Sequence, residues 1–473
     1  MDDEPGNKFT IAMADEVLRL RRPERAAKRM DSLVADYGVP KYFSGFDQYG
    51  LSIGNFLAGL APRFVMPFVK AKVRKDSEHV IIAGEKTAFS KYLRGREEAQ
   101  IRVNFNQLGE AVLGDVEARK RLDQYLKRLI KPGIDYCSVK LSSVVSQISL
   151  TGYESTLDAV KEQLRVLYRA AIEGGKPGKP KFVNLDMEEY RDLHLTVDTF
   201  KSVLDEAEFE NLVAGIVLQA YLPDSYCVLQ SLTDWARDRY LRTGAGIKIR
   251  LVKGANLAME QVEASLHDWE QAPYYNKLDV DANYKRMLEF ATRPENQKFM
   301  KVGLASHNLF DVAYALLVRE RRGTGEQLEF EMLEGMANAQ ALEVRERTGD
   351  LVVYTPVCFQ HDFESAVAYL VRRLDENTAP GSFLGALFAL EEGSPDWNEQ
   401  KDAFLQACER AKAPSLSSSP NRKQNRLIEM SVVTEPNQPF HNEPDTDFSL
   451  PENRDWLNQI VFNWKNEEIT TIP

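Results

Sequence analysis

Two adjacent arginines, Arg372 and Arg373, are the residues whose type and spacing point most directly to chemistry. The apolar residues around them recur at helical spacing, which predicts a helix over residues 363–376 packed on a core. Adjacent side chains lie about 100° apart around a helix, so both guanidiniums can lean toward one rim of the buried face. A planar guanidinium binds a carboxylate through two hydrogen bonds, which indicates a small carboxylate ligand. The structural alternative is a pair of exposed arginines bridged to Asp375 and Glu376.

Short apolar, β-branched runs alternate with longer helical patterns after Arg102, which is typical of repeated strand-helix units. The predicted strands are residues 101–105, 136–141, 182–186, 214–219, 247–252, 300–305, 328–332 and 351–356. The predicted helices between and after them are residues 116–129, 155–173, 195–207, 225–241, 280–291, 309–321 and 363–376.

This alternation predicts an α/β fold, a (β/α)8 TIM-type barrel, because about eight strand-helix pairs fit the usual length of that fold. A doubly wound open sheet is the alternative, although no GxGxxG fingerprint follows a predicted strand. The predicted organisation is a helical N-terminal region at residues 1–100, the barrel at 101–385, and a helix and linker tail at 386–473.

Polar side chains collect where these strands end, which is where barrels of this kind carry their sites. These residues are Lys140, Asp186, Gln219, Arg250, Lys253, Ser306, His307, Asn308, Glu331 and Tyr354. Buried charge is costly unless it is paired, so the set predicts a pocket rather than a packing device. Together with Lys277 and the arginine pair it is rich in cations, which favours an anionic ligand such as a carboxylate or a diphosphate. Taken singly, Lys140 and Asp186 could form a structural ion pair, and His307 could cap a helix.

Composition excludes several classes of function. The chain of 473 residues has 60 Lys+Arg against 71 Asp+Glu and a net charge of −11, which argues against nucleic-acid binding. The four cysteines are far apart and the histidines are scattered, so neither a disulfide framework nor a metal site is predicted. The N-terminus has no secretory signal pattern, and no apolar run reaches the length of a membrane span. Redox chemistry with an organic cofactor, Schiff-base chemistry on a lysine, and a carboxylate-binding module without catalysis remain.

Seven motifs, in this order, resemble the flavin-dependent proline dehydrogenases over roughly residues 100 to 385. They are Val103-Asn-Phe-Asn-Gln-Leu-Gly-Glu-Ala111, Val139-Lys-Leu-Ser142, Leu185-Asp-Met-Glu-Glu189, Arg250-Leu-Val-Lys-Gly-Ala255, Ser306-His-Asn308, Leu333-Glu-Gly-Met336 and Tyr369-Leu-Val-Arg-Arg-Leu-Asp-Glu-Asn377. The segment from Phe440 to Pro451 resembles the connector into the aldehyde dehydrogenase half of bifunctional proline utilization A proteins. We therefore expect this half to belong to the same polypeptide in the full-length protein.

The resemblance implies oxidation of L-proline to Δ1-pyrroline-5-carboxylate, with FAD as hydride acceptor and a membrane quinone as the later acceptor. It implies a cytoplasmic protein with peripheral contact at the inner face of the cell membrane. The implied catalytic residues are Arg250, Asp186 and Tyr354. The implied substrate-binding residues are Lys140, Asp186, Leu333, Tyr354, Tyr369, Arg372 and Arg373. The implied cofactor-binding residues are Asp186, Met187, Gln219, Arg250, Val252, Lys253, Gly254, Ala255, Lys277, Ser306, His307, Asn308, Glu376, Ser382 and Phe383.

Two positions depart from the family pattern. Many members have an aromatic residue where this chain has Asn256 and an arginine where it has Asn276, so the diphosphate contact is expected to shift to Lys277. Two other functions are carried forward for the same barrel. One is a Schiff-base aldolase with Lys140 or Lys253 as the nucleophile, and the other is a non-catalytic scaffold.

Overall fold

The computed structural model describes residues 3–41, 45–109, 112, 114–363, 366, 367, 369–371, 373, 383–387, 390–428 and 442–466. The chain divides into two compact units. One comprises residues 1–110, 306–312 and 330–402, and the other residues 111–305, 313–329 and 403–473. The predicted boundaries near residues 100 and 385 stay a prediction.

A parallel sheet of nine strands is the centre of the described fold. Its strands are β1 (Ile82–Ala83), β2 (Arg102–Gln107), β3 (Tyr136–Lys140), β4 (Phe182–Asp186), β5 (Gly215–Gln219), β6 (Ile247–Val252), β7 (Met300–Ala305), β8 (Leu328–Leu333) and β9 (Val352–Cys358). The strands from β2 to β8 follow each other in chain order, and β9 pairs with both β2 and β8, so the sheet closes. The predicted (β/α)8 barrel is confirmed, and the open doubly wound sheet is wrong.

The predicted strands agree with the observed ones to within two residues at each end, because runs such as Gly215–Gln219 are almost continuously apolar and buried. The structure adds β1, a two-residue strand that the sequence did not indicate. It pairs in parallel with the end of β9, Ile82 opposite Val357.

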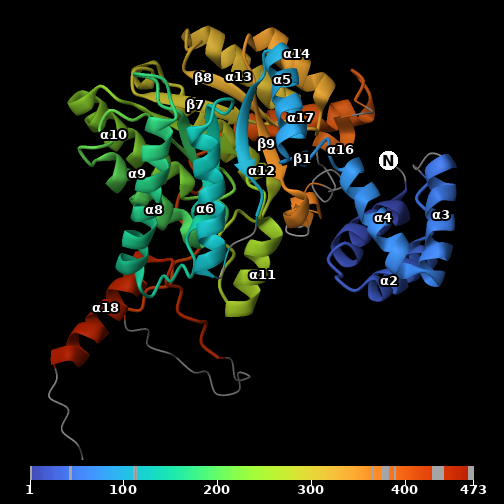
Figure 1. Ribbon diagram of the computed structural model, residues 1–473. Helices are drawn as coiled ribbons and strands as arrows, with labels where there is room; N and C mark the ends of the chain where they lie inside the picture. Colours follow the sequence, from blue (N-terminus) through green and yellow to red (C-terminus); the bar gives the residue numbers. More distant parts are fainter. Residues whose placement is uncertain are drawn as a thin grey trace, which may run out of the picture. The chain divides into compact units, whose positions relative to one another are not determined.

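Helices follow most strands and cover the sheet. In the unit that holds β3 to β7, α6 (Asp115–Ile130) packs on α8 (Tyr153–Glu173), and α8 packs on α9 (Leu193–Leu204) (Figure 1). The other helices of this unit are α7 (Leu141–Val144), α10 (Ser225–Thr243), α11 (Leu257–His267), α12 (Lys277–Ala291) and α18 (Pro451–Asn466). Helices α13 (Leu309–Arg322) and α17 (Pro395–Lys412) each contain residues of both units. Helix α14 (Asn338–Thr348) belongs to the first unit. Short turns of helix are η2 (Tyr190–Asp192), η3 (Pro294–Asn296), η4 (Gln360–Asp362) and α16 (Phe383–Leu387).

The helices that were not predicted include α11 and α14. Helix α11 has exposed apolar side chains, Met259, Val262 and Leu266 among them, so its pattern does not mark a single buried face. In α14 only Ala341 and Val344 are buried, which is too few to produce a visible helical period.

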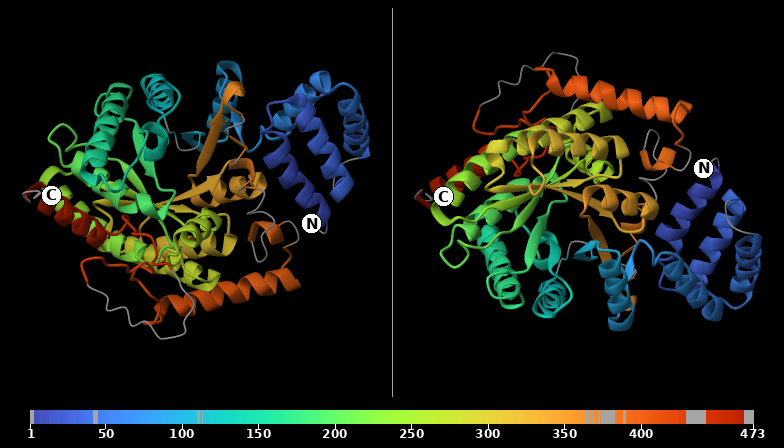
Figure 2. Two further views of the ribbon diagram at one scale, coloured as in Figure 1. Left: turned by 90° about the horizontal axis from the view of Figure 1, so that it is seen from below. Right: turned by 90° about the horizontal axis from the view of Figure 1, so that it is seen from above.

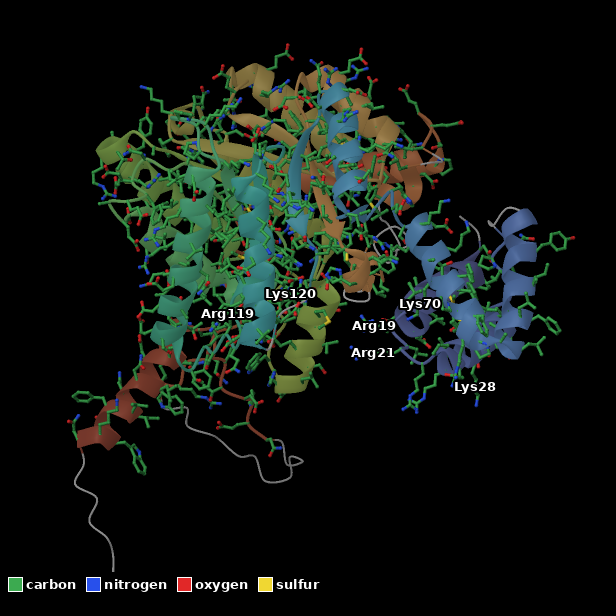
Figure 3. The ribbon with its side chains drawn as sticks, in the orientation of Figure 1. Arg19, Arg21, Lys28, Lys70, Arg119 and Lys120 are labelled. Carbon is green, nitrogen blue, oxygen red and sulfur yellow. The ribbon has the colours of Figure 1, made fainter. Side chains whose placement is uncertain are left out.

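The N-terminal helices have a core of their own. They are α1 (Glu4–Ala12), η1 (Met13–Val17), α2 (Pro23–Tyr37), α3 (Gly45–Leu60) and α4 (Pro62–Asp76), drawn in blue in Figure 2, with α5 (Lys86–Glu98) after β1. Phe9, Met30 and Leu33 are buried where α1 and α2 meet. Basic side chains, including Arg19, Arg21 and Lys28, project from this bundle (Figure 3). Lys70 instead ties α4 to the end of η1 by donating to the Leu20 carbonyl at 3.1 Å.

Candidate active site

Arg250 and Asp186 form a buried ion pair at the ends of β6 and β4. Arg250 Nη1 lies 3.3 Å from Asp186 Oδ1, and both side chains are less than a tenth exposed. Asn184 donates to the same carboxylate oxygen at 3.2 Å. Gly215 on β5 leaves the room for Asn184, because a Cβ there would lie 2.4 Å from Asn184 Oδ1. The pair fixes the direction of a guanidinium inside the barrel.

Lys140 at the end of β3 does not pair with Asp186, so that alternative is wrong. Its Nζ lies 2.7 Å from Glu188 Oε1, and both side chains are about one fifth exposed. The register does place Lys140 level with Asp186. Asp186 is already held by Arg250 and Asn184, however, and Glu188 reaches back from the loop after β4 to meet the lysine. Glu188 is a site residue that the sequence reasoning did not include.

Gln219 ends β5 with its amide directed by the same loop. Its Nε2 donates to the Glu188 carbonyl at 3.3 Å. Its Oε1 is buried and has no hydrogen-bond partner among the described residues. Met187, between Asp186 and Glu188, is buried as well. A ligand with an N–H group beside Gln219 would satisfy the buried oxygen, since buried polar atoms are normally hydrogen-bonded.

The segment Val252, Lys253, Gly254 and Ala255 begins at the last residue of β6 and leaves the strand in a conformation that requires glycine. Gly254 has a φ of +132°, and an added Cβ would lie 2.4 Å from the Tyr221 ring. The backbone N–H groups of Ala220 and Tyr221 donate to the carbonyls of Val252 and Lys253 at 2.8 and 2.7 Å. The strand end is therefore pinned, with its backbone packed directly against an aromatic ring.

Lys253 and Lys277 share one carboxylate, that of Asp281. Their Nζ atoms lie 2.5 Å from Asp281 Oδ1 and Oδ2. Burial raises the pKa of the Asp281 carboxyl, but the two lysines outweigh it and lower the pKa to about 2. The cluster carries one net positive charge. Asn276 caps α12 by accepting from the Asp279 N–H at 2.8 Å, so this departure from the family pattern has a structural role.

Ser306, His307 and Asn308 follow β7 in the other unit, and each makes a different contact. Asn308 Oδ1 accepts from the Phe310 N–H at 2.9 Å and caps α13, so the predicted capping role falls on Asn308 rather than His307. Ser306 Oγ accepts from the Asn308 N–H at 3.1 Å. His307 Nε2 accepts from the Leu333 N–H at 2.9 Å.

His307 is neutral at physiological pH. Burial, together with the nearby positive charge of Arg373, lowers the pKa of its imidazole to about 4. Because Nε2 accepts a hydrogen bond, the ring proton resides on Nδ1. This Nδ1 is buried and has no hydrogen-bond partner among the described residues. It is therefore a donor available to a ligand.

Arg373, Tyr369, Leu333 and Tyr354 lie in the same unit as His307. The Arg373 guanidinium sits over the Tyr369 ring, 5.0 Å from its centroid, and Arg373 is 7% exposed. Leu333 and Tyr354 are directly opposite each other in the β8–β9 register. Phe383 on α16 is buried near Phe310. The predicted site residues Arg372, Glu376 and Ser382 lie outside the described residues.

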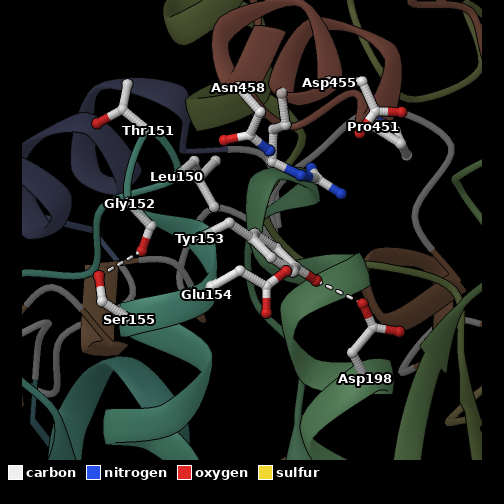
Figure 4. A pocket seen from close by; sticks show the side chains of 11 residues that line it. Leu150, Thr151, Gly152, Tyr153, Glu154, Ser155, Asp198, Pro451, Asp455 and Asn458 are labelled. Atoms are coloured by element: carbon white, nitrogen blue, oxygen red, sulfur yellow. Dashed lines mark hydrogen bonds between the residues drawn. The ribbon is translucent and has the colours of Figure 1, made fainter. Parts of the chain in front are cut away.

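A cavity of about 470 Å³ lies elsewhere, at the first turn of α8, and contains none of the predicted site residues. Tyr153 Oη donates to Asp198 at 2.6 Å across its floor (Figure 4). The Arg454 guanidinium stacks 4.0 Å from the Tyr153 ring centroid and takes up the aromatic face. Among the residues described, no cluster of His, Cys, Asp and Glu has the arrangement of a metal site.

Several known proteins are similar to this chain. The chain is 27% identical over 315 residues to the bifunctional protein PutA of Escherichia coli K12, a match of 62% of this chain and 23% of that protein. It is 27% identical over 288 residues to the proline dehydrogenase of Deinococcus radiodurans, a match of 59% of this chain and 79% of that protein. The structure of proline utilization A from Corynebacterium freiburgense superposes with a TM-score of 0.71 and 41% identity.

That superposition covers 83% of this chain and 37% of the Corynebacterium chain. The chain thus spans less than half the length of the bifunctional relatives it matches. The family model described as proline dehydrogenase matches residues 89–386, which is more than half of the chain. These residues include strands β2 to β9 and the candidate-site ion pairs and buried polar atoms described above. The chain belongs to the proline dehydrogenase family.

Proposed function

We propose that this protein oxidises L-proline to Δ1-pyrroline-5-carboxylate, the first step of proline catabolism, with FAD as the hydride acceptor. The observation that carries the proposal is the pair of buried arginines, Arg250 and Arg373, each held by a fixed neighbour in a barrel of the proline dehydrogenase family. The Deinococcus relative that is named proline dehydrogenase is matched over most of its own length, which supports the same activity here.

The carboxylate of proline is bound by Arg373, with Arg372 and Lys140 as further cations. The stacking of Arg373 on Tyr369 supports this role, because it fixes the plane of the guanidinium before the ligand arrives. Asp186, Leu333, Tyr354 and Tyr369 surround the pyrrolidine ring. Positioning is the main contribution of these residues, since a fixed reactant can gain several kcal/mol over free encounter.

The residues after β5, β6 and β7 fit FAD. Gln219 Oε1 and His307 Nδ1 are a buried acceptor and a buried donor without a partner among the described residues, and a flavin nucleotide offers both kinds of group. Lys253 and Lys277, with their net positive charge, suit a diphosphate. Met187, Val252, Gly254, Ala255, Ser306, Asn308, Glu376, Ser382 and Phe383 complete the proposed cofactor contacts.

Bound FAD would supply the acceptor for the hydride that leaves C5 of the proline ring. Arg250 holds positive charge where negative charge develops, and Asp186 keeps its guanidinium in place. The amine of proline is neutral when the hydride leaves, and its remaining proton passes to solvent. The product carries the new C=N bond, and the loss of one hydride from C5 and one proton from the nitrogen balances the step. His307 stays neutral throughout, because burial and Arg373 lower its pKa.

Electrons leave toward a membrane quinone, and the aldehyde dehydrogenase half of bifunctional relatives is the proposed partner on the same polypeptide. The names of the PutA relatives, of which this chain spans a part, support a second activity on the same polypeptide.

We also propose that the protein is cytoplasmic, contacts the membrane peripherally and has no nucleic-acid partner. Among the described helices, none is long and apolar enough to cross a bilayer. The helical region 1–100, barrel 101–385 and tail 386–473 are the proposed domains.

The Schiff-base alternative loses support from the lysines themselves. An amine nucleophile has to lose its proton, and an adjacent carboxylate stabilises the ammonium form instead. Lys140 faces Glu188 at 2.7 Å and Lys253 faces Asp281 at 2.5 Å.

Proline-dependent reduction of an electron-accepting dye by the purified chain tests the proposed function. Turnover that requires both proline and bound flavin is the expected result. A flavin-loaded chain that reduces no dye with proline would show that it is a scaffold or acts on another substrate.

A further inference from the structure

A buried polar cluster on the outer side of β8 and β9 has no part in the proposed function. Glu334, the residue after β8, is 2% exposed. One of its carboxylate oxygens accepts from the Tyr92 hydroxyl and the other from the Arg96 guanidinium. Tyr92 and Arg96 are four residues apart on α5, so they project from one face of that helix. Tyr92 Oη also lies 2.9 Å from Thr355 Oγ1 on β9.

Two members of this cluster, Glu334 and Thr355, are sequence neighbours of two proposed substrate-binding residues. Glu334 follows Leu333, and Thr355 follows Tyr354. Leu333 and Tyr354 are opposite each other in the parallel register, and the Glu334 N–H donates to the Tyr354 carbonyl at 3.0 Å. Successive side chains of a strand point to opposite faces, so Thr355 points away from the face that Leu333 and Tyr354 share. The Tyr92 hydroxyl contacts both Thr355 and Glu334, which places the Glu334 carboxylate beside Thr355.

The backbone on either side of Glu334 is fixed as well. His307 Nε2 holds the Leu333 N–H at 2.9 Å. Gly335 has a φ of +77°, and an added Cβ would lie 1.8 Å from the His79 carbonyl oxygen. The strand end is thus anchored at residues 333 and 335, and the side chain between them is held by α5.

Burial and the Glu334 carboxylate both raise the pKa of the Tyr92 phenol, so Tyr92 stays a hydroxyl donor at physiological pH. Arg96 keeps its charge and stacks 5.4 Å from the Tyr92 ring centroid. The three side chains form one connected network, in which loss of Tyr92 or Arg96 leaves the buried Glu334 carboxylate with one donor fewer.

We propose that Glu334, Tyr92 and Arg96 form a brace that sets the position of Leu333 and Tyr354, and with it the size of the ring that the enzyme accepts. The inference rests on the proposed function, since it takes Leu333 and Tyr354 as walls around the proline ring. Glu334 is a positioning residue, because it acts through its neighbours and does not touch the substrate.

The test compares Tyr92→Phe with Tyr153→Phe. Both substitutions remove one tyrosine hydroxyl that donates to a carboxylate, and Tyr153 lies in the other unit at the α8 cavity. The measured quantity is the ratio of kcat/KM for proline to kcat/KM for pipecolate, the homologue with a six-membered ring. A loss of overall stability lowers both values together and leaves this ratio unchanged.

We expect Tyr92→Phe to lower the ratio at least threefold and to raise KM for proline more than it lowers kcat, while Tyr153→Phe leaves the ratio unchanged. Glu334→Gln keeps an oxygen for Tyr92 but loses the ion pair with Arg96, so its ratio should fall between those of wild type and Glu334→Ala. An unchanged ratio in Tyr92→Phe and Glu334→Gln, with normal wild-type turnover, overturns the brace alone. Wild-type protein that does not oxidise proline overturns the proposed function and the brace with it.

Discussion

Replacement of Arg373 by alanine separates binding of the substrate carboxylate from every other effect of the arginine. Arg373 is 7% exposed, so a carboxylate next to it is largely withdrawn from water and depends on the guanidinium. A charge-assisted contact of this kind contributes about 2–3 kcal/mol. KM for proline should therefore rise roughly 30- to 150-fold, since about 1.4 kcal/mol corresponds to a factor of ten.

Pyrrolidine, which is proline without its carboxylate, supplies the internal comparison. With pyrrolidine as substrate, wild type and Arg373→Ala should have similar kcat/KM, because the contact that was removed does not exist for this molecule. Arg237→Ala is a matched control. Arg237 also stacks on an aromatic ring, 5.6 Å from the Phe299 centroid, but it lies on α10 away from the strand ends. Equal losses for proline and pyrrolidine in Arg373→Ala would refute the carboxylate clamp and leave only a structural role.

Three further outcomes are expected. Gly254→Ala should unfold at a lower urea concentration and lose bound flavin, because the residue has a φ of +132° and no room for a Cβ. The control Gly244→Ala, at a φ of +78° in open space, should lower the free energy of unfolding by only about 1 kcal/mol. The pKa of His307 falls from 6.5 in the unfolded chain to about 4 in the folded protein, so the unfolded chain takes up the proton first as pH falls. The free energy of unfolding should therefore decrease by up to about 3 kcal/mol between pH 6.5 and pH 4, and His307→Gln should flatten this part of the pH dependence measured by urea unfolding. Burial raises the pKa of Asp192 to about 7, so the stability that its protonated carboxyl contributes is complete below pH 4 and is lost as pH rises toward 7. Asp192→Asn should therefore raise the melting temperature at pH 8 but not at pH 4. Equal gains at both pH values would contradict a raised pKa for Asp192.

The barrel could be predicted from sequence because its signal is local. Each strand of a parallel sheet is buried on both faces, and the mostly apolar runs of β5 and β9 show this in five and seven residues. The predicted strands in turn indicated where each strand ends, and so identified Asp186, Gln219 and Arg250 as candidate site residues. Helix α11 was missed for the opposite reason, since its apolar side chains are partly exposed and give no single buried face.

The partners of the site residues could not be predicted in the same way. Lys140 and Asp186 are level on adjacent strands, yet Lys140 pairs with Glu188 because Arg250 occupies Asp186. The contact from His307 Nε2 to the Leu333 N–H joins residues 26 positions apart, so no local pattern records it. The choice among several nearby charges depends on side-chain reach and on burial, which appear only once the chain is folded.

Addition of L-proline to the purified, flavin-loaded chain in the absence of oxygen tests the central claim most directly. The account predicts that the visible flavin absorption bleaches with proline and does not bleach with an equal concentration of pyrrole-2-carboxylate, whose aromatic ring has no hydride to give. A protein that binds no flavin, or one whose flavin spectrum stays unchanged with proline, would contradict the account.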